Sequence, residues 1–198
     1  MFPPVTGRSW EFKDGLFIMT TDKAASNSDR ASIYFLFNTQ KSPSAIVTRF
    51  DYNILEPGVS PGRLRISNLD LAKSPQDFNA IDIQKVKSVE DGSEWFFLMF
   101  IRVENRNVAA GVNIIDLSKE VSSDPRQLIK FGENATSMKL IDLTTGKQLA
   151  FANFADLKDS QGNLLFPDGS FSPGGLISTN FITAPGHQIV IKELAMFK

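Results

Sequence analysis

The sequence predicts an all-β protein, and within that class an antiparallel β-sandwich of the immunoglobulin-like or jelly-roll-like kind. Residues 95–101 are seven apolar residues in a row, which is typical of a strand covered on both faces. About a dozen strand-like segments follow one another at the ~8–15-residue spacing of sandwiches and barrels, with turn residues between them. No long segment has helical periodicity, so at most one or two short helices are expected.

The first half of the chain begins with a loose arm at residues 1–8, which contains two prolines and a glycine. Strands are expected on both sides of Asp14-Gly15, because this dipeptide favours a two-residue hairpin. Residues 31–38 are apolar throughout and predict an inner strand, whereas residues 45–55 alternate and predict one buried and one wet face. The other elements expected here are two strands and one helical turn, at residues 63–67, 81–89 and 74–77.

The second half contains the apolar run 95–101, which is expected to be the other inner strand. Residues 123–127 place a capping residue before a proline, and this order predicts a short helix over 125–130. Two more hairpins are expected at residues 144–146 and 158–163, where glycine can adopt a positive φ. The last strands are expected at residues 176–183 and 188–194.

Chain length and composition favour one domain over residues 1–198. The 198 residues are 42% hydrophobic, which is enough for one sizeable core. The 17 phenylalanines have no polar tip that must be satisfied, so such a core can be dry. The alternative is an accessory β-hairpin region at 9–75 beside a core sandwich at 80–198. No linker longer than about ten residues separates the two parts, and this favours the single domain.

Charge and cysteine content exclude several functions. The formal net charge of −1 leaves no positive excess to hold a phosphate backbone, so no nucleic-acid partner is expected. The apolar runs are far shorter than the ~20 residues of a membrane helix, so no transmembrane segment is expected. The absence of cysteine excludes disulfides, thiolate metal sites and cysteine nucleophiles.

Catalytic constellations are absent from the sequence, and no catalytic residue or cofactor is assigned. His187 is the only histidine, and it is expected to be a solvent-exposed turn residue before the last strand. One imidazole without a Gly-x-Ser-x-Gly elbow predicts neither a triad nor a zinc centre. Asp82 and Glu94 would lie on neighbouring strands if 81–89 pairs with 95–101, and a glycosidase needs two carboxylates ~5–10 Å apart. Carboxylates at strand ends on the surface explain them equally well.

Two groups of residues are weaker candidates for contact with a ligand. Oxygen-bearing residues alternate in the loop 156–163, as in calcium loops, but no glutamate completes an EF-hand and a plain hairpin turn is favoured. These residues are Asp159, Gln161 and Asn163. Near the N-terminus, aromatic side chains could form an exposed platform for a sugar or a protein, with core packing as the favoured alternative. These are Trp10, Phe12 and Phe17.

Three motifs in the C-terminal half resemble the immunoglobulin-like domains of bacterial surface lipoproteins. They are an inner strand ending in asparagine at residues 100–105, a strand–Asp–Gly–Lys hairpin at 140–147, and a proline-glycine turn before a final strand pair at 172–186. The insertion at 118–133 departs from the pattern of that family, and residues 1–75 have no counterpart in it. The resemblance implies an exported binding or scaffolding module without catalysis.

Three functional hypotheses follow. The first is a non-catalytic binding or structural module that acts through protein–protein contacts or self-association in a cell-surface or virion-type assembly. This hypothesis favours a surface, periplasmic or virion location over a cytoplasmic one. The second is a carrier of a small apolar ligand, with a barrel pocket lined by phenylalanines. The phenylalanines expected there are Phe35, Phe37, Phe97, Phe100 and Phe151. The third is a carboxylate-dependent glycan hydrolase.

Overall fold

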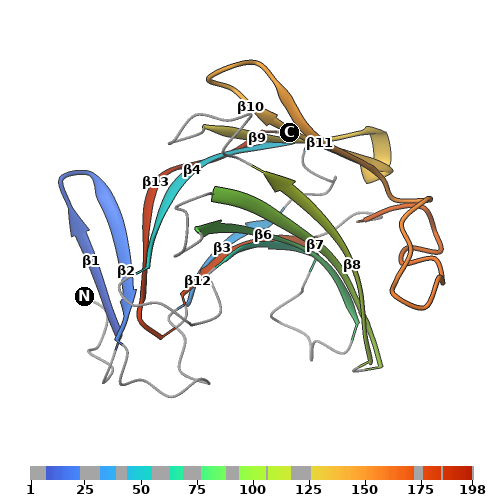
Figure 1. Cartoon of the computed structure of the whole chain (residues 1–198), viewed down its shortest axis with the longest axis horizontal. Helices are drawn as coiled ribbons and strands as arrows, with labels where there is room; N and C mark the ends of the chain where they lie inside the picture. Colours follow the sequence, from blue (N-terminus) through green and yellow to red (C-terminus); the bar gives the residue numbers. More distant parts are fainter. Residues whose placement is uncertain are drawn as a thin grey trace.

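The strands form two antiparallel sheets packed face to face, as seen in a computed structural model of the chain (Figure 1). The structure describes residues 8–22, 32–38, 44–54, 63–68, 77–87, 94–105, 107–116, 126–171, 176–183 and 185–197. All strand pairings between these residues are antiparallel. The predicted all-β sandwich is therefore confirmed.

Each sheet combines strands from both ends of the chain. In order across the seven-stranded sheet, the strands are β1 (Arg8–Lys13), β2 (Leu16–Thr21), β13 (His187–Phe197), β4 (Ala45–Ile54), β9 (Gln127–Phe131), β10 (Ser137–Asp142) and β11 (Gln148–Asn153). Across the six-stranded sheet they are β3 (Ser32–Asn38), β12 (Leu176–Ile182), β5 (Arg63–Ser67), β6 (Phe78–Lys87), β7 (Glu94–Glu104) and β8 (Asn107–Asp116). Figure 1 shows that both sheets curve in the same sense, with the six-stranded sheet inside the curve.

The apolar run lies in β7, and its two faces are covered to different degrees. Phe96, Leu98 and Phe100 point into the core and are at most 2% exposed. Phe97 and Met99 lie on the opposite face and are half-buried, so the expected burial of both faces is only partly right. The second expected inner strand is wrong, because β3 is the outermost strand on its side of the described sheet.

Phenylalanine rings fill one end of the core in close contact. Phe154 lies at the centre of this group, with its ring centroid 5.3 Å from that of Phe166, 5.7 Å from that of Phe171 and 6.1 Å from that of Phe100. These rings meet edge-on or offset, the arrangements that aromatic quadrupoles favour. The cluster connects the six-stranded sheet to the segment that follows β11.

The hairpin expected at Asp14-Gly15 is confirmed between β1 and β2. Asp14 has φ 52° and Gly15 has φ 77°, and two positive φ values in a row are typical of the type I′ turn. The turn after β10 is confirmed as well. There the buried Asp142 carboxylate accepts hydrogen bonds from the Thr144 backbone N–H (2.8 Å) and the Thr145 hydroxyl (2.9 Å).

The helix predicted over 125–130 is wrong, because residues 127–130 lie in β9 instead. Gln127, Ile129 and Phe131 are buried, while Leu128 is half-buried and Lys130 is exposed, which is the period of a strand. Pairing with β4 and β10 outweighs the local capping signal. The described residues contain one helical segment, the 3₁₀ turn η1 (Glu133–Ala135). Residues 74–76 of the helical turn expected at 74–77 lie outside the described residues. No helix in the described part of the chain has the length and apolarity needed to cross a membrane.

An ion pair joins the start of β9 to β13, and it predicts a measurable pKa shift. Arg126 donates from Nε to Glu193 Oε2 (2.7 Å) and from Nη2 to Oε1 (2.5 Å). These hydrogen bonds, together with the charge of Arg126, lower the pKa of Glu193 below its ordinary value. We expect Arg126→Ala to raise the pKa of Glu193, as measured by NMR titration of its carboxyl carbon. An unchanged pKa would contradict the pairing.

The sign of the pH effect follows from the lowered pKa. The folded state holds the Glu193 proton less tightly than the unfolded state, so the pair stabilises the fold above the ordinary glutamate pKa of about 4.3. That contribution is lost as the pH falls through the folded-state pKa. It is expected to be small and to weaken with salt, because both side chains are substantially exposed.

Candidate functional site

The N-terminal aromatic residues lie on one face of the β1–β2 hairpin. Trp10 is opposite Met19 and Phe12 is opposite Phe17, so strand alternation places all four on the same side. Met19 is in the core, and Trp10 and Phe17 are half-buried against it. Phe12 is 75% exposed. Core packing thus explains two of the three candidates, and a partner contact through Phe12 stays a prediction.

The Asp159 loop is a hydrogen-bonded turn. The Asp159 carboxylate accepts hydrogen bonds from the backbone N–H groups of Gln161 and Asn163 (both 2.9 Å) and from the side-chain amide of Asn163 (3.3 Å). Desolvation would raise the pKa of Asp159, but these hydrogen bonds with Asn163 and Gln161 and another from the Gly162 backbone outweigh it and lower the pKa. The described residues contain no cluster of three or more acidic or histidine side chains that could hold a metal. The calcium site stays a prediction, and the turn explains the loop without it.

His187 is buried at the start of β13, so its expected exposure is wrong. It is 1% exposed and lies between Thr21 of β2 and Ile54 of β4 in the sheet. The nearby Thr21 and Thr183 hydroxyls hydrogen-bond to each other. Sheet pairing on both sides, which the local turn signal does not report, explains the burial.

Asp82 and Glu94 do lie on paired strands, but the register separates them. Asp82 is opposite Met99, and Glu94 is opposite Lys87. Lys87 is five residue steps along β6 from Asp82, a distance of about 16 Å at ~3.3 Å per step. That exceeds the ~5–10 Å between the carboxylates of a glycosidase, so this pair cannot act as one.

The phenylalanines proposed for a carrier pocket do not line one cavity. Phe97 and Phe100 lie on opposite faces of β7. Phe151 is 52% exposed, and its ring is 6.0 Å from Lys139 Nζ on the surface. The side chains of Phe35 and Phe37 lie outside the described residues.

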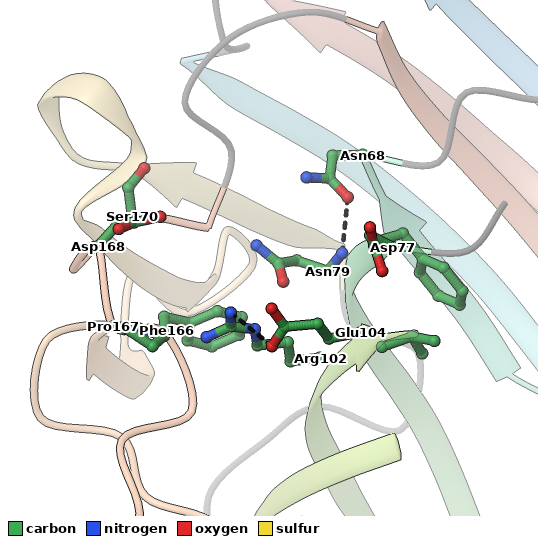
Figure 2. Close-up of a pocket in the computed structure, with 11 residues that line it drawn as sticks. Asn68, Asp77, Asn79, Arg102, Glu104, Phe166, Pro167, Asp168 and Ser170 are labelled. Carbon is green, nitrogen blue, oxygen red and sulfur yellow. Dashed lines mark hydrogen bonds and ion pairs between the residues drawn. The ribbon is translucent and has the colours of Figure 1, made fainter. Parts of the chain in front are cut away.

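A polar hollow that the sequence did not predict lies at one end of the sandwich (Figure 2). We call it the end hollow, and its volume is about 190 Å³. Its lining includes Asn68, Asp77, Asn79, Arg102, Glu104, Phe166, Pro167, Asp168 and Ser170. Figure 2 shows Asn68 and Asp77 on one side and Asp168 and Ser170 on the other.

Strand alternation explains why polar side chains gather there. The last apolar row across the inner face of the six-stranded sheet consists of Ile66, Ile81 and Phe100. One step further toward the end of the sandwich, the same face carries Asn68, Asn79 and Arg102. The core-facing rows therefore continue as amides and a guanidinium where the apolar core ends.

Hydrogen bonds fix the strand side of the end hollow. The Asn79 backbone N–H donates to Asn68 Oδ1 (2.6 Å), and the Asn79 amide donates to the Phe171 carbonyl (2.8 Å). The Asn105 N–H donates to Asp77 Oδ1 (2.7 Å), which connects the start of β6 to the β7–β8 turn. A site held by such bonds loses little entropy when a ligand binds.

The opposite wall is formed by residues 166–171, which are fixed by burial of two side chains in the core and by hydrogen bonds to the turn at 133–135. Phe166 and Phe171 are in the core, and the Phe171 N–H donates to the Ala135 carbonyl (3.0 Å). The Ser170 hydroxyl donates to the Asn134 carbonyl (2.7 Å). These contacts leave Pro167 and Asp168 exposed at the rim.

Arg102 and Glu104 form an ion pair (2.9 Å) that borders the end hollow. The Arg102 side chain is 27% exposed and that of Glu104 is 58% exposed, so both can still contact a ligand. Together with the amides, these groups offer donors and acceptors at short spacing, as recognition of hydroxyl groups requires. One signal in the sequence could have pointed to this site. Arg102 and Glu104 continue the alternation of Phe96, Leu98 and Phe100, so they lie on the same face of the strand.

Comparisons with known proteins show a shared fold. No protein-family model matches the chain, and no curated protein matches its sequence. The CBM2 module of the evolved Dit of Lactobacillus casei phage J-1 aligns with a TM-score of 0.53 and 11% identity, over 94% of this chain and 77% of that one. A structure from work on endo-acting O-glycanases of human gut bacteria, which initiate mucin breakdown, aligns with a TM-score of 0.52 and 10% identity, over 93% of this chain and 74% of that one.

Proposed function

We propose that this protein is a non-catalytic carbohydrate-binding module and that a glycan enters the end hollow. The observation that carries the proposal is the row of Asn68, Asn79 and Arg102 at the mouth of the sandwich, bordered by Glu104 and Asp168. Amide, guanidinium and carboxylate groups match sugar hydroxyls, which both donate and accept hydrogen bonds. The two aligned structures come from a carbohydrate-binding module and from work on glycan-cleaving enzymes, which supports a glycan ligand.

The location that fits this proposal is the surface of a virion or the outside of a cell. One aligned structure is a module of a phage protein, and the other comes from work on gut bacterial enzymes that initiate mucin breakdown, and both support such a location. A binding module there would hold a larger assembly on its target surface.

Removal of Arg102 tests the proposal most directly. We expect Arg102→Ala to weaken binding to the best glycan of a printed array at least about tenfold, which corresponds to ~1.4 kcal/mol, because a charge-assisted donor is lost. Arg126→Ala is the matched control, since it also breaks an exposed Arg–Glu pair, but one on the other sheet. Equal affinities of the two variants, or no glycan binding by the wild type, would contradict the proposal.

The alternative function for the same residues is hydrolysis of a glycan. Asp77, Glu104 and Asp168 bring three carboxylates to the end hollow. Two of them are already engaged, Glu104 by Arg102 and Asp77 by the Asn105 N–H. We expect no release of reducing sugar when the protein is incubated with mucin O-glycans, and release that Glu104→Gln abolishes would replace binding by hydrolysis.

A further inference from the structure

We infer that the end hollow is one subsite of a longer groove that takes several units of an uncharged glycan chain. This inference rests on the proposed function and specifies its ligand. A second depression, the side hollow, has a volume of about 600 Å³ and shares Arg102 and Glu104 with the end hollow. Its other lining residues include Val108, Asp159, Gln161 and Leu164.

The two hollows are neighbours along the strand ends. Arg102 is opposite Ala109 in the β7–β8 pair, and Glu104 is opposite Asn107, so one strand spacing leads from one hollow to the next. That spacing is about 4.8 Å, so a ligand that extends past the Arg102–Glu104 pair must enter both hollows. The shared pair therefore lies at the junction of two subsites.

The wall of the side hollow is a hydrogen-bonded loop that packs against β8. Lys158 and Leu164 form an isolated bridge, and the Leu165 N–H donates to the Leu157 carbonyl (2.8 Å). A Cβ atom on Gly111 would lie 2.8 Å from the Lys158 carbonyl oxygen, so glycine permits this close approach. The loop formed by residues 158–164 is therefore a fixed wall, and the hydrogen bonds that Asp159 accepts within this loop help to fix it.

Size indicates a ligand that fills both hollows. The end hollow, at about 190 Å³, lies below the ~300–1,000 Å³ typical of ligand pockets, whereas the side hollow lies within this range. Leu164 is 48% exposed, so the side hollow offers aliphatic surface to the apolar faces of sugar rings. A single sugar unit in the end hollow would leave this surface unused.

Charge specifies the class of glycan. Among the described lining residues of the two hollows, four are carboxylates and one is a cation. The carboxylates are Asp77, Glu104, Asp159 and Asp168, and the cation, Arg102, is paired with Glu104. Sulfated, phosphorylated or sialylated chains would meet this negative excess and be repelled, whereas neutral hydroxyls can donate to the carboxylates.

Calorimetry on the whole protein tests the inference with neutral oligosaccharides of one to four units, taken from the chains that bind on the array. We expect the tetrasaccharide to bind at least about tenfold more tightly than the single unit, and Leu164→Ala and Gln161→Ala each to remove about threefold of that gain, or ~0.7 kcal/mol. The matched controls are Leu143→Ala and Gln148→Ala, which change exposed residues near the β10–β11 turn. Neutral chains are also expected to bind at least about tenfold more tightly than their sulfated or sialylated counterparts.

The outcomes separate this inference from the proposed function. Glycan binding that Arg102→Ala weakens but that neither Leu164→Ala nor Gln161→Ala changes would keep the end hollow as a binding site and overturn the groove. A preference for the anionic member of each pair would overturn the uncharged ligand class. No binding to any glycan would overturn the proposed function and the inference with it.

Discussion

Phe154→Ala is expected to lower the free energy of unfolding by about 3–5 kcal/mol, the range measured for truncation of large buried aromatics. Phe154 is fully buried, and its ring packs against those of Phe100, Phe166 and Phe171. Truncation would leave a cavity that these neighbours cannot close without moving the backbone, because they come from β7 and from the wall of the end hollow. Urea unfolding followed by tryptophan fluorescence measures the loss.

Phe151→Ala is the matched control for this experiment. Phe151 is three residues away on β11, but its side chain is 52% exposed, so we expect a change within about 0.5 kcal/mol. Similar losses for the two variants would contradict the position of Phe154 at the centre of the aromatic cluster. We also expect Phe154→Ala to weaken glycan binding at temperatures where it stays folded, because Phe166 would lose a neighbour under the hollow.

Asp82→Ala is expected to destabilise the fold by about 3 kcal/mol, the lower end of the range for breaking a buried ion pair. Asp82 is fully buried on the outer face of β6, where Arg65 donates from Nε (2.6 Å) and from Nη2 (2.8 Å) to its two carboxylate oxygens. Arg63 Nε lies 3.3 Å from Oδ2. Removal of the carboxylate would take away the buried anion that two mostly buried guanidinium groups share.

The matched control is Asp51→Ala, which breaks the Lys192–Asp51 pair (2.6 Å) on the seven-stranded sheet. Asp51 is 33% exposed, so its loss is expected to cost less than about 1 kcal/mol. Arg65→Lys in the otherwise wild-type protein should keep only part of the stability that the Arg65–Asp82 pair contributes, because an ammonium group cannot make the bidentate contact. An Asp82→Ala variant as stable as the wild type would contradict the buried pair.

The position of Asp82 illustrates how a sequence hypothesis can locate a residue correctly and misjudge its role. Asp82 and Glu94 were expected on neighbouring strands only on the condition that these strands pair, and β6 and β7 do pair. Register was not predictable, because β6 has enough alternating residues to pair with β7 at several offsets. The observed register places Asp82 beside Arg65 and makes it a structural ion-pair residue.

Local signals were reliable where the chain reverses and less so where tertiary contacts compete. Asp14-Gly15 forms the expected hairpin because both residues tolerate positive φ. The stretch from Pro125 to Lys130 carries a helix-start signal, yet β9 forms, because pairing with β4 and β10 buries Gln127, Ile129 and Phe131. His187 is likewise buried by strands that are far away in the sequence.

The all-β class, the reversals of the chain and the phenylalanine-rich composition of the core can be read from the amino acids alone, because these features depend on residue type and on a period of two along the chain. Which side chains meet at the end hollow depends instead on contacts between distant parts of the chain. Asn68, Asn79, Arg102 and Asp168 are up to 100 residues apart, and they lie together because strand order, register and the docking of residues 166–171 place them there. Those features depend on packing between distant segments, which no local pattern encodes.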